Sequence, residues 1–459
     1  MVLDEVLKRF ANESPVTLMA RLTMQRALSP EWMDELFEAK REQQYTRELL
    51  FSTEVDLMAL VALGLRPSLH AAAQSMKELP VSVAALYEKV KHTEPEVVRA
   101  LVQGSADRLI PVIAPMKQKQ APWAAGYRVR VVDGNHLAAS EKRLKPLRGF
   151  RGAALPGQSL VVYAPELGQV VDMLAAEDAH AQERALMGPV LARVKEGELW
   201  LADRNFSTRS ILWALHEKKA CFIIREHQAS PHPTEVGPLC KVGRVETGVV
   251  FEQAVRLENE AGSQWELRRI ELHLDEPTED GETVIRLLTN VPAERMSALE
   301  VAELYRRRWT IEGMFGELEA VLQSEVKSLG HPRAALLAFG VAVMAYNVLS
   351  VLKTVIETCH QLPGTGEEIS TYYIATEVKS NYGGMMIAVP QKVWGEYDLQ
   401  SAHELSDTLL RLAEQVTPKT LRKHKRTPTK KKAKKGYVSG EEARRHVATA
   451  RVLKGEEVT

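Results

Sequence analysis

The sequence predicts an α/β protein whose mixed-sheet core carries a β-rich insertion and is flanked by helical regions. Three observations support this prediction. Helical patterns dominate residues 1 to about 120. Short β-branched runs then alternate with helices as far as residue 225, and residues 226–292 hold β-rich runs separated by Gly, Pro and acidic turns. Helical patterns return at Ser297.

Length and composition narrow the class of protein. The chain has 459 residues, which at about 100–200 residues per domain indicates several domains. It is 45% hydrophobic and 26% charged, which is typical of globular proteins and excludes collagen-like and low-complexity chains. Three widely spaced cysteines without a CxxC pair exclude a zinc ribbon and favour a reduced, intracellular protein. The first residues lack the apolar stretch of a signal peptide, so we expect a cytoplasmic protein.

The balanced net charge hides a strongly basic segment. Residues 419–435 contain ten Lys or Arg and no Asp or Glu, although the chain as a whole has 60 residues of each sign. So dense a block repels itself and is typical of a disordered tail. It favours a tether to nucleic acid through phosphate neutralisation, with a solubilising tail as the alternative.

Residues 334–352 form an apolar stretch that is just long enough to cross a bilayer. A buried core helix has the same composition, and no second stretch of this kind occurs. We therefore predict a buried helix and no membrane association.

Local signals predict several element boundaries. Ser29 should cap a helix that starts with Pro30, and Thr93 with Glu96 should form a capping box. Residues 80–92 and the helix that follows are compatible with a helix-turn-helix, although ordinary helical packing explains them as well. In the C-terminal region we expect a Gly-rich turn at Tyr382, an amphipathic helix, and a second capping box at Ser439.

The predicted core strands place acidic residues at their ends. A strand over residues 127–132 stops at Asp133, and a strand over residues 199–202 stops at Asp203. Between them lie a hairpin centred on residues 165–168 and a helix over about 180–195. Ser207 should cap the next helix, and residues 220–225 should form another strand. Loops at strand ends are where open α/β sheets place their functional sites.

A third acid, Glu312, lies on a helix predicted to run from Ser297 past residue 328. Tyr305, Arg308 and Glu312 are spaced i, i+3 and i+7, so they share one helix face. Converging carboxylates need a compensating cation, and Mg²⁺ prefers oxygen ligands. Two such ions can clamp the attacking and leaving oxygens of a phosphodiester displacement. Each acid alone has a simpler interpretation: a turn or N-cap residue for the aspartates, and an ion pair with Arg308 for Glu312.

The ordered set of VVDG at Asp133, LADRNF at Asp203 and YRRRWTIEGMF at Glu312 resembles the DDE transposases of bacterial insertion sequences. It is most similar to the subgroup with the Y-(2)-R-(3)-E-(6)-K signature, because Tyr305, Arg308 and Glu312 match its spacing. Trp309 and Phe315 also resemble the family, and the resemblance spans the whole chain. One position departs: Glu319 stands where the signature has Lys, which the family is thought to use on DNA. Arg306, Arg307 or Lys327 are candidates to supply that contact.

The resemblance implies a ribonuclease-H-like core in which Asp133, Asp203 and Glu312 are catalytic and bind two Mg²⁺, with Mn²⁺ as a substitute. It implies cleavage at the ends of the element and attack of the freed 3′-OH on target DNA. The expected partners are double-stranded DNA and a second copy of the chain in a synaptic homodimer, in a bacterial cytoplasm. The expected regions are a helical DNA-end-binding part (1–122), the first part of the core (123–225), a β-rich insertion (226–292), the core completion with Glu312 (293–360), a helical C-terminal region (361–415), and a basic tail with a short terminal helix (416–459).

Further residues are candidates for DNA contacts. Arg308, one helical turn from Glu312, could neutralise a phosphate or orient the glutamate, and Tyr305 on the same helix face is a second candidate. Trp265 in the insertion could stack on a flipped base, with strand packing as its alternative. A basic patch just after Asp133 could grip the DNA backbone, with a solvated loop as the alternative; its members are Lys142, Arg143, Lys145, Arg148 and Arg151. Asp178, His180 and Glu183 resemble a metal trio, but helix capping and dipole roles explain them better.

Two other functions compete with an active transposase. A transposase-derived DNA-binding protein that no longer cuts is favoured by Glu319 and opposed by the intact Asp133, Asp203 and Glu312. An unrelated metal-dependent nuclease fits the acids but not the long β-rich insertion.

Overall fold

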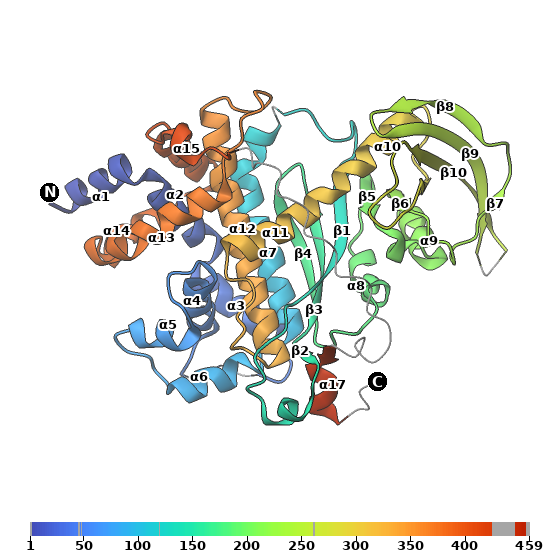
Figure 1. Cartoon of the computed structure of the whole chain (residues 1–459). Helices are drawn as coiled ribbons and strands as arrows, with labels where there is room; N and C mark the ends of the chain where they lie inside the picture. Colours follow the sequence, from blue (N-terminus) through green and yellow to red (C-terminus); the bar gives the residue numbers. More distant parts are fainter. Residues whose placement is uncertain are drawn as a thin grey trace.

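The computed structural model describes residues 2–44, 46, 48–118, 120–259, 262–424 and 446–455. Figure 1 shows a helical part built from both ends of the chain, a central sheet, and a curved extension of that sheet formed by the β-rich segment. The mixed α/β class predicted from the sequence is confirmed at this level.

Seven helices precede the sheet, as the helical periodicity predicts. They are α1 (Val2–Glu13), α2 (Pro15–Ala27), α3 (Pro30–Lys40), α4 (Phe51–Ala62), α5 (Leu69–Ser75), α6 (Val83–Val90) and α7 (Pro95–Lys117). Ser29 caps α3 by accepting a hydrogen bond from Trp32 N, as predicted. The capping box at Thr93 is wrong. Glu94 is the N-cap of α7, and the Thr93 hydroxyl instead donates to the buried carboxylate of Glu54, 2.7 Å away.

The central sheet is mixed. Its main path runs β4-β3-β1-β5-β6-β11-β10-β9-β7, with β8 paired to β9. The strands are β1 (Arg128–His136), β3 (Gln158–Ala164), β4 (Gln169–Ala176), β5 (Glu198–Ala202), β6 (Cys221–Arg225), β7 (Thr234–Glu235), β8 (Cys240–Val245), β9 (Gly248–Glu258), β10 (Gln264–Leu274) and β11 (Val284–Thr289). The predicted hairpin is β3–β4, whereas β1 runs parallel to β5 and β5 parallel to β6.

The β-rich segment extends the central sheet and does not form a separate one. Its last strand, β11, pairs antiparallel with β6, and β10, β9 and β7 follow outward from it. Figure 1 shows these strands curving away from the helical part of the molecule. The predicted insertion is therefore joined to the core through backbone hydrogen bonds.

The two faces of β1 pack against different helices because alternate side chains of a strand point to opposite faces. Val129 and Val131 belong to a large apolar core shared with α7 and with α12 (Pro332–Cys359). Val132 belongs to a second core with α8 (Met187–Leu191) and α9 (Arg209–Glu217). The helix predicted over about 180–195 is shorter, consisting of the 3₁₀ turn η2 (Glu183–Leu186) and α8. Thr208, not Ser207, caps α9.

The helix predicted from Ser297 past residue 328 is interrupted. Ser297 forms a capping box with Glu300 at the start of α10 (Ala298–Arg306), a 3₁₀ turn η4 follows at Arg307–Trp309, and α11 (Thr310–Val321) ends before residue 328. Within the described residues α12 is the one helix long and apolar enough to cross a membrane. The protein buries 94% of its most apolar window, so the predicted buried helix is confirmed.

The C-terminal part returns to the helical side. Its helices are α13 (Thr371–Ala388), α14 (Gln391–Asp398), α15 (Ala402–Ala413) and α16 (Pro418–Leu421). The predicted Gly-rich turn at Tyr382 is wrong, because Tyr382 and both glycines after it lie inside α13. β12 (His446–Ala448) pairs with β2 (Ala153–Leu155) and leads into α17 (Thr449–Lys454). Most of the basic run and the predicted capping box at Ser439 lie outside the described residues.

Candidate active site

The two aspartates lie level with each other on neighbouring parallel strands. Val132 of β1 is in register with Ala202 of β5, so Asp133 and Asp203, which follow them, both lie at the carboxyl end of this strand pair. Asp203 directly follows β5, as predicted. Asp133 does not end its strand, because β1 continues to His136 through pairing with β3. Asp133 therefore lies beside Asp203 as predicted, but within a strand whose pairing with β3 holds it in place more firmly than a loop would.

Arg308 joins the third acid to this strand end. Its Nη1 donates to Asp133 Oδ2 at 2.9 Å, and its Nη2 donates to Glu312 Oε1 at 3.0 Å. The η4 turn places Arg308 against β1 although it breaks the predicted helix, and the i, i+4 spacing to Glu312 is retained. Arg308 is only 7% exposed, and its Nε has no partner among the described residues. The sequence suggested that Arg308 either orients Glu312 or pairs with it. In the structure one hydrogen bond does both.

Burial and neighbouring charges together shift the pKa values of this group of side chains. Burial raises the pKa of Asp133 to about 6, helped by the negative charges of Asp203 and Glu183 and opposed by Arg308. Burial alone would lower the pKa of Arg308, but the phenol of Tyr305 and the three carboxylates hold it above its ordinary value. Arg308 thus interacts electrostatically with all three predicted acids.

Asp203 has a structural role as well. Its Oδ1 accepts a hydrogen bond from Asn205 N at 2.8 Å, which caps the 3₁₀ turn η3 (Arg204–Phe206). This is the capping interpretation that the sequence left open, and it leaves Oδ2 outside that bond. Capping and a function at the strand end are therefore compatible.

The donor chemistry suits a hard divalent cation, since three carboxylates lie around one strand end. Nevertheless, among the described residues no three His, Cys, Asp or Glu side chains are close enough together to hold a metal ion. The guanidinium of Arg308 lies between Asp133 and Glu312 and supplies the positive charge there. A metal bound by both acids would require this guanidinium to move.

A comparison with protein families finds a match to this part of the chain. Residues 124–348 match the family model of the transposase DDE domain. The match spans just under half of the chain, includes all three acids, and supports a DDE transposase. No curated protein matches the sequence. Among solved structures, the piggyBac transposase synaptic complex with hairpin DNA matches with a TM-score of 0.38 and 11% identity, over 82% of this chain and 84% of that chain.

Two of the predicted DNA contacts, Tyr305 and Arg308, are buried. Tyr305 is 8% exposed and packs in the main core, where burial raises its pKa to about 12. Arg308 is also buried, and its guanidinium bonds to Asp133 and Glu312, so neither Tyr305 nor Arg308 presents a surface to DNA in this structure.

Trp265 also lies away from the carboxylates. Its ring stacks on His216 with centroids 3.8 Å apart and meets Phe222, near the amino end of β6, edge-on. The acids lie at the carboxyl end of the neighbouring strand β5, so Trp265 belongs to the opposite end of the sheet. Ordinary strand packing, the alternative given for Trp265, accounts for this position. Trp309, which the sequence analysis noted only as family-like, is 65% exposed and directly follows Arg308.

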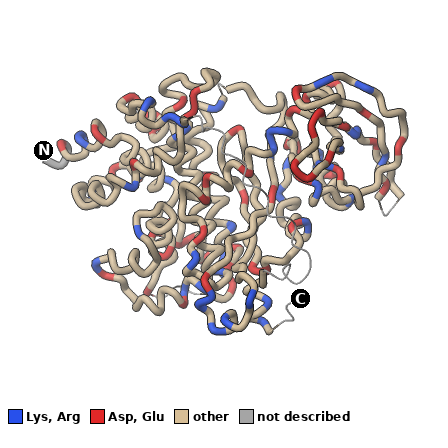
Figure 2. The backbone as a smooth tube through the Cα atoms, in the orientation of Figure 1, with Lys and Arg blue, Asp and Glu red and all other residues tan. Residues whose placement is uncertain are grey.

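The basic patch lies at the same end of the sheet as the acids, because the loop that carries it follows the carboxyl end of β1. Arg143, Lys145, Arg148 and Arg151 are exposed and Lys142 is half-buried. Figure 2 shows Lys and Arg gathered in this loop, near the described end of the chain. The apolar residues Leu147, Ala154 and Val447 hold the loop against the C-terminal segment.

Glu319 lies close to Glu312. It lines a cavity of about 280 Å³ together with Glu312, Glu325 and Asn135. Of the residues considered as substitutes for the missing lysine, Arg306 pairs with Glu246 and Arg307 lies over the ring of Trp123. Lys327 is exposed and acts electrostatically on Glu325, which lines this cavity.

Glu183 is a residue of the site to which sequence reasoning gave only a structural role. Its Oε1 lies only 1.9 Å from the position that a Cβ on Gly134 would occupy. Its Oε2 accepts a hydrogen bond from Asn205 Nδ2 at 3.2 Å. Asp178 and His180 do not join it in a metal site, because Asp178 pairs with Arg451. The sequence held only one local indication of this contact: the glycine that follows Asp133, which leaves room for the side chain of another residue.

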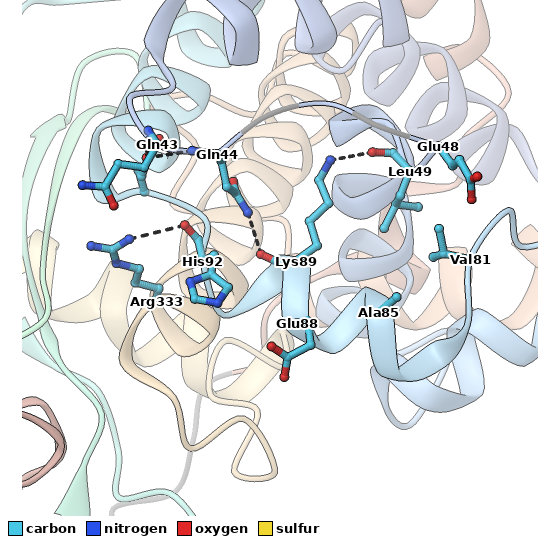
Figure 3. Close-up of a pocket in the computed structure, with 11 residues that line it drawn as sticks. Gln43, Gln44, Glu48, Leu49, Val81, Ala85, Glu88, Lys89, His92 and Arg333 are labelled. Atoms are coloured by element: carbon cyan, nitrogen blue, oxygen red, sulfur yellow. Dashed lines mark hydrogen bonds between the residues drawn. The ribbon is translucent and has the colours of Figure 1, made fainter.

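A larger hollow, of about 880 Å³, lies in the N-terminal helical part (Figure 3). Its polar groups are largely engaged with the chain: Lys89 Nζ donates to Leu49 O, and Gln44 Nε2 donates to Lys89 O. The Glu94 carboxylate accepts from the backbone N–H groups of Glu42 and Gln43. The hollow therefore offers no set of reactive groups comparable to the carboxylates.

Proposed function

We propose that the protein is a transposase that cuts DNA at the ends of its own insertion sequence and joins the freed 3′-OH ends to target DNA. One observation carries the proposal. Asp133 and Asp203 lie level on two neighbouring parallel strands, and Arg308 donates to both Asp133 and Glu312, all within the segment that matches the transposase DDE domain.

The ribonuclease-H-like core belongs to this proposal. We assign it to the strands β4-β3-β1-β5-β6, which are joined by two antiparallel and two parallel pairings, with α11 and α12 against the face that carries Asp133. Glu312 comes from α11, so the sheet and the helix each contribute part of the site.

In the first step, a water oxygen would bond to the scissile phosphorus, the bond from phosphorus to the 3′ oxygen would break, and the freed 3′ oxygen would take a proton. In the second step this hydroxyl would attack a target phosphorus and release a target 3′ oxygen. Divalent cations, Mg²⁺ with Mn²⁺ as a substitute, would supply charge neutralisation and activate the attacking oxygen. Asp133, Asp203 and Glu312 would hold them.

Arg308 would act as a positioning residue. In the free protein it neutralises Asp133 and Glu312, which keeps two negative side chains close together at a buried strand end. Its release toward a DNA phosphate would open the acids to cations as DNA arrives. The exposed Trp309, adjacent in sequence, would move with it and offer its ring to a base.

Double-stranded DNA and a second copy of the chain are the proposed partners, in a bacterial cytoplasm. The loop that carries Lys142, Arg143, Lys145, Arg148 and Arg151 would grip the backbone beside the acids, contributing affinity without sequence information.

A DNA fragment bearing the native flanks of the coding region tests the proposal. Wild type should cut it at two fixed positions with Mg²⁺ or Mn²⁺ and not with EDTA. Asp203→Asn should not cut but should still bind, because an asparagine keeps the oxygen that caps Asn205 N and loses only the charge. Asp275→Asn, a surface acid paired with Arg244, is the matched control and should cut normally. Equal cutting by wild type and Asp203→Asn would exclude the proposed site.

A DNA-binding protein that no longer cuts is the second candidate. The specific observation in its favour is Glu319, which shares a cavity with Glu312 and would repel a phosphate there. Binding to the flanks without metal-dependent cuts by wild type would select this function.

A further inference from the structure

A second cavity, of about 360 Å³, adjoins the carboxylates on the other side of β1. Its walls come from chain segments that follow each aspartate: His136 ends β1 after Asp133, and Arg204 and Asn205 follow Asp203. Glu183 and Arg184 of η2 and His227 after β6 complete it. The α8 and α9 helices lie on this side of the sheet (Figure 1).

Glu183 connects this cavity to the active site. Its carboxylate lies directly over Gly134, so close that any side chain at position 134 would displace it. The same carboxylate accepts from Asn205, two residues after Asp203, and its charge raises the pKa of Asp133. A DNA strand that placed a phosphate at the carboxylates would therefore have the cavity beside its next nucleotide.

The cavity presents hydrogen-bond donors. The Nε of Arg184 donates a hydrogen bond to Gln182 Oε1 at 2.8 Å. No hydrogen bond within the described chain engages the two terminal amino groups of Arg184. His227 Nδ1 accepts from Ala229 N at 3.0 Å, which assigns the proton of the neutral ring to Nε2 as a donor.

A buried hydroxyl also lacks a partner. Ser207 lines the cavity and is 1% exposed, and its Oγ has no hydrogen-bond partner among the described residues. A buried polar group without a partner is costly, and a bound ligand would satisfy it. The nearby N-cap position is taken by Thr208, so Ser207 is not needed for the start of α9.

We propose that this cavity binds one nucleotide of the cleaved DNA strand, adjacent to the scissile phosphate. Arg184 and His227 would hold its phosphate, and Ser207 would bind an oxygen of its sugar or phosphate. The proposal rests on the proposed function, because it takes its ligand from the strand that the carboxylates would cut. A volume of about 360 Å³ matches a single nucleotide, so we expect the strand to leave its duplex locally to enter.

Thymidine 3′,5′-bisphosphate tests the cavity without knowledge of the element, because it carries the sugar and both phosphates of one nucleotide. Its binding is measured by calorimetry in EDTA, which keeps metal ions out of the result. The variants are Arg184→Gln and His227→Asn. The asparagine retains an acceptor for Ala229 N and removes only the Nε2 donor. Arg193→Gln, an exposed arginine just beyond α8 that does not line the cavity, is the matched control.

Wild type and Arg193→Gln should bind the bisphosphate equally, and each cavity variant should bind roughly tenfold more weakly, the loss expected for a charge-assisted hydrogen bond. No binding by wild type, or equal binding by all four proteins, would overturn the proposal. Equally tight binding of inorganic phosphate to wild type would also overturn it, since the cavity would then be an anion site only.

The cleavage assay separates this inference from the function on which it rests. If wild type cuts the flanking fragment, Arg184→Gln should raise KM for that fragment several-fold and leave kcat near the wild-type value. If wild type cuts nothing, the transposase proposal fails while the bisphosphate titration still reports on the cavity. An unchanged KM in an active Arg184→Gln enzyme would contradict the assignment to the cleaved strand.

Discussion

Arg308 and Asp133 form the contact that organises the candidate active site: Nη1 of the arginine lies 2.9 Å from Oδ2 of the aspartate, and both side chains are largely buried. The second amino group reaches Glu312, so one guanidinium joins the sheet to the helix. A monovalent protein cation thereby occupies the position between two acids that the proposed function assigns to divalent cations.

Arg308→Ala should therefore impair both stability and cleavage. Removing one member of a fully buried ion pair costs about 3–5 kcal/mol, and we expect about 2 kcal/mol here because Glu312 is 41% exposed and can be solvated. Urea unfolding measures the loss. Asp133→Asn combined with Arg308→Ala should lose less than the sum of the single changes, because the neutral asparagine no longer needs the guanidinium. Strict additivity of the two changes would show that the contact contributes nothing.

Arg308→Lys separates charge from geometry. Lysine keeps the positive charge but has a single nitrogen, which cannot occupy the positions of both Nη1 and Nη2 that face Asp133 and Glu312. Its cleavage rate should fall far below wild type while its stability remains closer to wild type than that of the alanine variant. A lysine variant that cuts at the wild-type rate would show that bidentate bridging is not required.

Glu319→Lys should strengthen DNA binding. The side chain lines a cavity with Glu312 and Glu325, so this change replaces a repulsion of phosphate by an attraction. We expect roughly tenfold tighter binding of the flanking fragment at low salt, measured by fluorescence anisotropy. Glu319→Gln should give a smaller gain, since it only removes the negative charge. Unchanged affinity in both variants would mean that DNA does not approach this cavity.

The basic loop should contribute through charge alone. Replacing Lys145 and Arg148 by glutamine should reduce the slope of log affinity against log salt by about 1.8, because each phosphate contact contributes about 0.9. Arg193→Gln with Lys195→Gln removes the same charges near the amino end of β5 and should leave the slope unchanged. Equal slopes in the two double variants would place the DNA elsewhere.

The aspartates were predictable because their surroundings are local in sequence. Apolar β-branched runs end near Asp133 and Asp203, and parallel pairing then brings these positions level. The η4 break at Arg307–Trp309 was missed because its residues have no helix-breaking side chain; it is the packing of Arg308 against β1 that fixes its position. Likewise, α13 continues through two glycines because tertiary packing outweighs their poor helix propensity.

The role of Glu183 could not be read from the sequence, because it depends on a contact with Gly134 across a distance of many residues. Local patterns made it a helix-dipole residue, which is a fair description of its place in η2. The same holds for the nucleotide cavity, whose walls come from four separate segments. Its donors are ordinary surface residues until the sheet brings those segments to one edge.

Glu54 should make the stability of the helical part depend on pH. It is fully buried, and burial raises its pKa to about 7, while the hydroxyl of Thr93 opposes the shift. Between about pH 4.5 and 7 the folded protein keeps a proton that the unfolded chain has lost, so the free energy of unfolding should fall as pH rises through this window. The loss is about 3 kcal/mol at most, from roughly 1.4 kcal/mol per pKa unit.

Glu54→Gln removes the titrating group, so its stability relative to wild type should increase from pH 5 to pH 8. Urea unfolding at the two pH values measures this difference, and the comparison cancels other groups that titrate in the same range. Glu35→Gln, an exposed acid of α3, should run parallel to wild type. If Glu54→Gln also ran parallel to wild type, the carboxyl group of Glu54 would have to be ionised in the folded protein at pH 5, and the burial of its charge would have to be compensated by groups other than Thr93.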